Sequence, residues 1–163
     1  MLFRSPWLLG LDLARGCNYY AVTDSDLDLS SVPTDLLNVL SAGLQKFPRA
    51  NKAGLSLELD DLPVSRATTQ VREWEAHFWE KRLDSQFFDA DVDTTFALYR
   101  AGTGWGGNGG PAIRTDRPYT ARHVPWYMTA ETITAEERYY LDHCDRAHSA
   151  WAGRIMESLG ASA

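Results

Sequence analysis

Segments with strand patterns alternate with segments with helix patterns, and this order constrains the fold more than any other feature of the sequence. Residues 18–23 are rich in β-branched and aromatic types, residues 52–59 alternate apolar and polar side chains, and residues 94–100 form another apolar run. Two short extended pieces follow within residues 112–128. Helical patterns occupy the intervening residues 34–47 and 68–83, and a long terminal helix is expected over 134–159. This alternation predicts an α/β layer structure.

The first and last expected helices carry end signals, and the first two carry apolar faces. Thr34 is the expected N-cap of the first helix and Pro48 its stop, and Thr134 with Glu137 forms a capping box for the last. The first two helices each show apolar residues at helical spacing. The predicted core-facing residues are Leu36, Leu37, Leu40, Leu44 and Phe47 in the first helix, and Val71, Trp74, Phe78 and Trp79 in the second.

Length and charge limit the classes of function. A chain of 163 residues without internal repeats is expected to form a single domain over 1–163. Its formal net charge of -6 argues against a nucleic-acid partner, which requires clustered Lys and Arg. No apolar stretch approaches the length of a membrane span. The two cysteines, Cys17 and Cys144, are expected to be free thiols, and together these features favour a cytoplasmic protein.

Asp24 and Asp26 directly follow the first expected strand, in the stretch YYAVTDSDLDLS. In an open α/β sheet, ligands bind beyond the carboxyl ends of strands. Two carboxylates two residues apart suit a hard cation such as Mg²⁺ or Mn²⁺, which leaves positions open for phosphate oxygens. A solvated acidic turn is the alternative interpretation of the same pattern. A calcium loop is not supported, because its sixth position would be Leu29 instead of Gly and its twelfth Asp35 instead of Glu.

A glycine-rich stretch over 101–111 is expected to be a flexible loop within the domain. It contains the pattern GxGxxG, but Pro111 and an extended segment follow it where a dinucleotide fingerprint requires a helix. A lid or substrate loop, with Trp105 as a ring on which a sugar could stack, is one interpretation. A plain surface loop is the other.

Two further segments bring candidate side chains. His123, in the stretch RHVPWY, can supply a neutral imidazole to a metal, although a lone His is more often structural. Asp93 precedes the expected strand at 94–100, which would place it beside the site if that strand neighbours the first one. A carboxylate there can act as general base on an acceptor hydroxyl, or it can be a turn or cap residue.

The order of the segments YYAVTDSDLDLSSVPTDLL, NKAGLSLELDDLP, WEAHFWEKRL, DADVDTTFALYR and AIRTDRPYTARHVPWYM resembles a group of bacterial and phage glycosyltransferases of the GT-A fold, over about Arg4 to Trp151. The resemblance implies a partial GT-A-like, Rossmann-like mixed sheet flanked by helices. It implies that Asp24 and Asp26 hold Mn²⁺ or Mg²⁺ against the diphosphate of a nucleotide sugar, with His123 as third ligand. Asp93 is then the candidate base, and Arg122 and Trp105 are candidates for binding the donor.

Transferases of this fold begin with a βαβ nucleotide-binding half, whereas here the DxD pair already starts at Asp24. The expectation is therefore a transferase domain that lacks this half. It would be a fragment, or a second chain would supply the nucleotide pocket. The implied reaction transfers a sugar from a nucleotide-diphosphate sugar to a hydroxyl of a glycan or another acceptor. A non-catalytic binding module derived from such an enzyme is the alternative.

Overall fold

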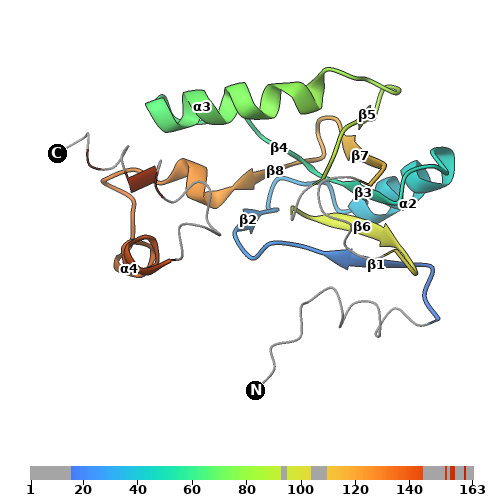
Figure 1. Ribbon diagram of the computed structural model, residues 1–163, viewed down its shortest axis with the longest axis horizontal. Coiled ribbons are helices and arrows are strands. Elements are labelled where there is room, and N and C mark those ends of the chain that lie inside the picture. The colour runs from blue at the N-terminus through green and yellow to red at the C-terminus, as the bar shows by residue number, and fades with distance from the viewer. Residues whose placement is uncertain are drawn as a thin grey trace.

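The structure, a computed structural model, describes residues 16–92, 95–103, 110–144, 153, 155–156 and 160 (Figure 1). Within them the chain has a mixed α/β architecture, as the alternating patterns predict. The strands are β1 (Tyr19–Val22), β2 (Leu27–Asp28), β3 (Lys52–Gly54), β4 (Ser56–Leu57), β5 (Phe87–Asp89), β6 (Ala97–Arg100), β7 (Ala112–Thr115) and β8 (Thr120–His123). The helices are α2 (Leu36–Lys46), α3 (Arg66–Glu75) and α4 (Ala135–His143), with 3-10 turns η1 (Ala76–Trp79) and η2 (Val124–Tyr127).

The described strands form two mixed sheets. The larger has the order β1-β6-β3-β7-β5, and the smaller has the order β2-β8-β4. In the larger sheet only β3 and β7 run parallel to each other, while β6 is antiparallel to both β1 and β3. Since β3 and β4 are separated by Leu55 alone, and β7 and β8 by a short turn, the two sheets share a continuous core.

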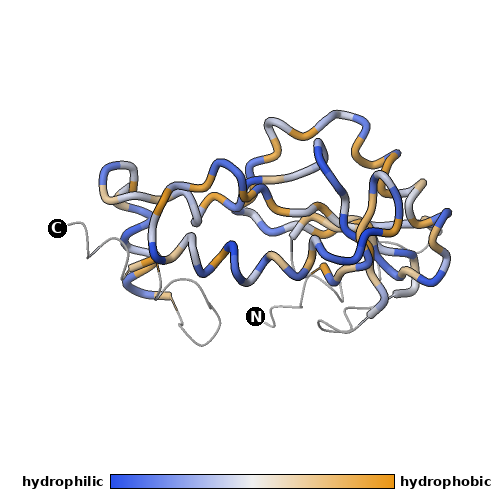
Figure 2. The backbone as a smooth tube through the Cα atoms, turned by 90° about the horizontal axis from the view of Figure 1, so that it is seen from above, coloured by the Kyte–Doolittle hydropathy of each residue, from blue (hydrophilic) through white to orange (hydrophobic). Residues whose placement is uncertain are grey.

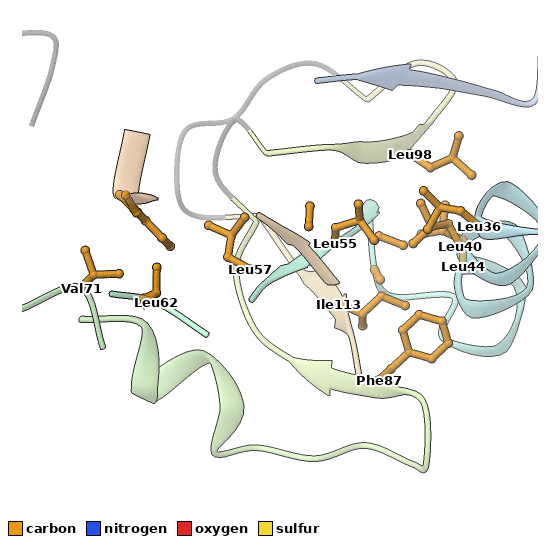
Figure 3. Packing of buried hydrophobic residues seen from close by; sticks show 14 residues of the cluster. Leu36, Leu40, Leu44, Leu55, Leu57, Leu62, Val71, Phe87, Leu98 and Ile113 are labelled. Atoms are coloured by element: carbon orange, nitrogen blue, oxygen red, sulfur yellow. The ribbon is translucent and has the colours of Figure 1, made fainter. Parts of the chain in front are cut away.

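One main hydrophobic core joins helix α2 to the larger sheet and extends toward α3. Figure 3 shows the α2 leucines facing Ile113 and Phe87 on one side, and Val71 of α3 close to Leu62 on the other. Leu40 and Leu44 are fully buried, because their four-residue spacing places both on one helical face. This core fixes α2 against the sheet.

Helix α2 begins one residue later than its sequence signals indicate. The N-cap is Asp35, so the assignment of Thr34 is wrong. Tyr119 donates its hydroxyl hydrogen bond to the Asp35 carboxylate, and the Asp35 carbonyl accepts from the amide of Asn38. The expected core position Leu37 is 54% exposed, since it lies about 100° around the helix from Leu36.

Gly43 provides space for an aromatic ring where α2 meets the sheet. A Cβ atom at this position would lie 2.4 Å from the Phe87 ring, and Phe87 is itself buried. We expect Gly43→Ala to lower the free energy of unfolding by up to about 2 kcal/mol, because an overpacking cost of about 1–3 kcal/mol opposes a helix-propensity gain of about 1 kcal/mol. Urea unfolding measures this. In a Phe87→Leu background the same substitution should cost less, and a stabilising effect of Gly43→Ala in the otherwise unchanged chain would contradict the expectation.

The strands differ in burial from their predicted patterns. Residues 18–23 were expected to be a buried strand, but β1 is a partly exposed strand at the edge of the larger sheet. The segment 52–59 alternates in sequence, yet every residue from Lys52 to Leu57 is buried, since both faces of the chain are covered here. The alternating pattern does not predict that Lys52 is buried in this segment.

The second helix turns a different face to the core than expected. It begins at a capping box of Ser65 and Thr68, and its regular part ends at Glu75 before η1. Val71 is buried as predicted, but Trp74 is 57% exposed. Glu75 is buried in its place, which is possible because a basic side chain from β7 lies opposite it.

The prediction of one long helix over 134–159 is wrong. The capping box of Thr134 and Glu137 is present, but α4 ends at His143 and Cys144 has an extended backbone. Leu141 and Ile155 belong to one buried cluster. Fourteen residues of unbroken helix would separate these two side chains by roughly 21 Å, so their shared cluster also disagrees with one continuous helix.

Within the described part of the chain, no helix is long and apolar enough to cross a membrane. Figure 2 shows hydrophobic and hydrophilic residues interspersed along the whole tube instead of collected in one apolar stretch. Cys17 and Cys144 are free thiols, as predicted. Asp93, Trp105 and most of the glycine-rich segment 101–111 lie outside the described residues.

Candidate functional site

The two aspartates of the DxD pair lie in the connection between β1 and β2. β1 ends at Val22, and Asp26 directly precedes β2. Because β2 pairs with β8 in an antiparallel register that sets Leu27 opposite His123, the connection is held against the end of β8. The amide of Val124 donates to the carbonyl oxygen of Asp26 at 2.9 Å, which fixes the backbone of Asp26 there.

This pairing brings Asp26 and His123 together across almost a hundred residues of sequence. Nε2 of His123 lies 3.4 Å from Oδ2 of Asp26. The hydrogen bond with His123 is the main cause that lowers the pKa of Asp26 below its usual value, against the opposing effect of partial burial. The Trp126 ring packs on the imidazole with centroids 4.7 Å apart, so the His123 ring has a fixed orientation.

Two polar atoms of this pair point into buried surroundings. Oδ1 of Asp26 and Nδ1 of His123 are both buried, and neither has a hydrogen-bond partner among the residues that the structure describes. Buried polar atoms normally have a partner, which can also be a water or an ion. The Asp26 and His123 pair is therefore one place among the described residues where a bound group would satisfy existing polar atoms.

The chemistry of the two side chains suits a divalent cation. A carboxylate oxygen and an imidazole nitrogen are ligands that Mn²⁺ accepts, and Mg²⁺ prefers the oxygen. Asp24 is half-buried two residues before Asp26 and has interactions of its own. Among the described side chains, no group of three or more His, Cys, Asp or Glu is close enough to hold one ion. Geometry thus brings together two of the three predicted ligands, Asp26 and His123.

Arg122, the predicted donor-binding residue, is engaged by carboxylates. Its Nε and Nη2 atoms lie 2.7 Å and 2.6 Å from Oδ2 of Asp61, and Nη1 lies 3.9 Å from Oδ2 of Asp28. Tyr127 donates its hydroxyl hydrogen bond to the other oxygen of Asp61 at 2.7 Å. These hydrogen bonds, that of Tyr127 first and that of Arg122 second, lower the pKa of Asp61. A phosphate group that binds Arg122 must share it with Asp61.

Asp28 has the role of a turn residue. Its Oδ1 accepts a hydrogen bond from the amide of Ser30 at 2.8 Å, and this bond is the main cause that lowers the Asp28 pKa. The third aspartate of the alternating run thus stabilises the backbone on the approach to α2. Asp24 and Asp26 therefore remain the predicted ligands of the run.

The topology of the larger sheet brings the start of β6 to the end of β1. β6 pairs directly with β1, and the antiparallel register sets Ala97, the first residue of β6, opposite Val22, the last residue of β1. The strand expected at 94–100 is therefore a direct sheet neighbour of the first strand, as the placement of Asp93 beside the site requires. Asp93 itself is outside the described residues.

A group of buried charges was not predicted. Lys52, Glu75 and Arg114 are all at most 5% exposed. Arg114 lies 2.9 Å from Glu75, and its guanidinium lies 3.7 Å from the centre of the Phe78 ring. The sequence feature that could have indicated buried cations is a basic residue in each of two short, mainly apolar stretches. These are Lys52 in KAGLSL and Arg114 in AIRT.

Comparison of the chain with protein-family models, with curated proteins and with solved structures found no match.

Proposed function

We propose that this chain is a metal-dependent glycosyltransferase domain of the GT-A type, which uses a nucleotide-diphosphate sugar as donor and a hydroxyl group as acceptor. The observation that supports it best is the meeting of Asp26 and His123 at 3.4 Å, each with a buried polar atom that has no partner among the described residues. The sequence resemblance supplies the identity of the reaction. The free cysteines are compatible with the cytoplasmic location that the proposal includes.

In this proposal Asp26 and His123, together with Asp24, hold Mn²⁺ or Mg²⁺. The cation, when bound, neutralises the negative charge that develops on the departing diphosphate. The contribution of the chain is to fix the ligands. The bond from the Val124 amide sets the Asp26 backbone, and the Trp126 ring sets the plane of the imidazole.

The remaining roles are assigned from the sequence resemblance. Asp93 accepts the proton of the acceptor hydroxyl if the transfer inverts the anomeric centre. Arg122 binds the donor diphosphate in exchange for part of its contact with Asp61, and Trp105 stacks on a sugar ring. The acceptor is a glycan or another molecule with a free hydroxyl, and a second chain completes the nucleotide pocket if this domain does not form it alone.

Calorimetry with UDP and GDP sugars, in the presence and absence of Mn²⁺, tests the proposal. We expect binding only when Mn²⁺ and the nucleotide sugar are both present, with a dissociation constant between about 1 μM and 1 mM, the usual range for enzyme substrates. EDTA should abolish the heat of binding. If the folded protein shows no metal-dependent nucleotide binding, the enzyme proposal is wrong, and a non-catalytic module derived from such an enzyme becomes the better description.

A further inference from the structure

A carboxylate from the turn after β4 lies against the guanidinium of Arg122. β4 and β8 run parallel, with Leu57 opposite Ala121, so this turn and the end of β8 lie at the same end of the smaller sheet (Figure 1). Nε of Arg122 donates a hydrogen bond to Oδ2 of Asp61 at 2.7 Å, and Nη2 lies 2.6 Å from the same oxygen. Asp61 thus occupies the edge of the guanidinium that an oxygen of a bound phosphate would use.

Tyr127, the last residue of η2, fixes the other side of the Asp61 carboxylate. Its hydroxyl donates a hydrogen bond to Oδ1 of Asp61 at 2.7 Å. Burial first, and the bond to Asp61 second, raise the pKa of Tyr127, so the hydroxyl keeps its proton at neutral pH. Both oxygens of Asp61 therefore have partners, and the carboxylate has a fixed orientation against Arg122.

Negative charge outweighs positive charge in this group of side chains. Asp28 is a second carboxylate near Arg122, although its Oδ2 is more distant from Nη1, at 3.9 Å. The neighbouring cation Arg117 is paired with Asp60 at 2.8 Å. The side chains of Arg122 and Asp61 are 38% and 42% exposed, so a dissolved anion can reach both of them. Such an anion meets the charge of Asp61 together with that of Arg122.

We propose that Asp61 is a specificity-determining residue of the donor site, which prevents Arg122 from binding a diphosphate that arrives without its divalent cation. The inference rests on the proposed function, in which Arg122 binds the donor diphosphate. Like charges placed side by side disfavour a wrong partner strongly, and specificity can come from such a repulsive contact. A free diphosphate is repelled by Asp61, whereas a bound cation offsets this repulsion.

Asp61→Asn tests the proposal, because asparagine keeps the size of the side chain and an oxygen that accepts from Arg122, but removes the charge. Calorimetry at low ionic strength measures the binding of inorganic pyrophosphate in EDTA and of UDP in Mn²⁺. In EDTA we expect the variant to bind pyrophosphate at least about tenfold more tightly than the unsubstituted chain. In Mn²⁺ the affinity for UDP should change by no more than about threefold, because the cation already offsets the charge of Asp61.

Two further variants identify the origin of the gain. Asp60→Asn is the matched control, since it makes the same change one residue away, at a side chain that is 77% exposed and pairs with Arg117 instead of Arg122. It should leave both affinities unchanged. The double variant Asp61→Asn with Arg122→Gln should lose the gain for pyrophosphate, because the gain requires the cation that Asp61 neutralises.

Unchanged affinity for pyrophosphate in folded Asp61→Asn would overturn the inference, as would an equal gain in Asp60→Asn or a gain that persists in the double variant. If Asp61→Asn does not fold, Tyr127→Phe replaces it. This variant loosens Asp61 and should tighten pyrophosphate binding at least about threefold, and no change would overturn the inference.

A separate result decides the proposed function. If the unsubstituted chain shows no Mn²⁺-dependent binding of nucleotide sugars, the proposed function is wrong. A gain in Asp61→Asn that requires Arg122 would then show an anion site that Asp61 blocks, without a role in sugar transfer.

Discussion

Replacement of Arg114 by methionine is expected to lower the free energy of unfolding by about 3–5 kcal/mol. Arg114 and Glu75 form an ion pair at 2.9 Å whose side chains are 2% and 5% exposed. The substitution removes the cation and leaves a buried carboxylate without its charged partner, which is far more costly than the loss of a surface pair. Urea unfolding at pH 7, followed by circular dichroism, measures the effect.

The pH dependence of this loss identifies its cause. Burial is the main effect on Glu75 and raises its pKa above the ordinary value of 4.5, while Arg114 opposes the shift. A group whose pKa is raised by folding favours the folded state fully below its unfolded pKa, and this contribution is lost as pH rises through the folded pKa. Without Arg114 the pKa of Glu75 should rise further. The loss caused by Arg114→Met should therefore be smaller at pH 5 than at pH 8.

Two controls separate the buried charge from lost packing. The double variant Glu75→Gln with Arg114→Met removes both charges and should recover a large part of the stability. Arg82→Met removes a pair between a half-exposed Arg82 and Asp116 and should cost less than about 1 kcal/mol. A loss from Arg114→Met that is equal at pH 5 and pH 8, and unchanged in the double variant, would contradict this explanation.

Local patterns predict the elements of this fold better than their ends and faces. The capping box at Thr134 and the spacing of Leu40 and Leu44 act within one or two turns, so the sequence reveals them directly. The end of α4 at His143 has no such local signal, and Leu141 shares its buried cluster with Ile155, which is distant in the sequence. The helical pattern of the sequence continues past His143, so the pattern alone does not reveal this helix end.

The same distinction applies to the candidate site. Residue type alone suggests Asp26 and His123 as ligands, but their contact depends on the pairing of β2 with β8. The contact between Arg122 and Asp61 likewise joins β8 to the turn after β4. Lys52 and Arg114 escape prediction because a charged residue in a strand pattern is normally placed on a solvent face. Their burial follows from layers that cover both sides of the sheet.

Asp26→Asn is expected to lower Mn²⁺-dependent release of UDP or GDP from nucleotide sugars by at least about 100-fold, if the proposed function is correct. Asparagine preserves the size of the side chain and removes the negative charge that a divalent cation requires. It also replaces one carboxylate oxygen by an NH₂ group, which repels a metal. The contact with His123 and the buried Oδ1 atom make Asp26 the aspartate of the run with the strongest geometric support.

Asp28→Asn is the matched control, since it makes the same chemical change two residues away. Oδ1 of Asp28 accepts from the Ser30 amide, and an asparagine oxygen can accept that bond equally well. We therefore expect Asp28→Asn to change turnover by no more than about threefold. Similar losses in both variants would show that the general negative charge of the turn matters, and that Asp26 is not a specific ligand. A loss in Asp28→Asn alone would transfer the role from Asp26 and its contact with His123 to Asp28.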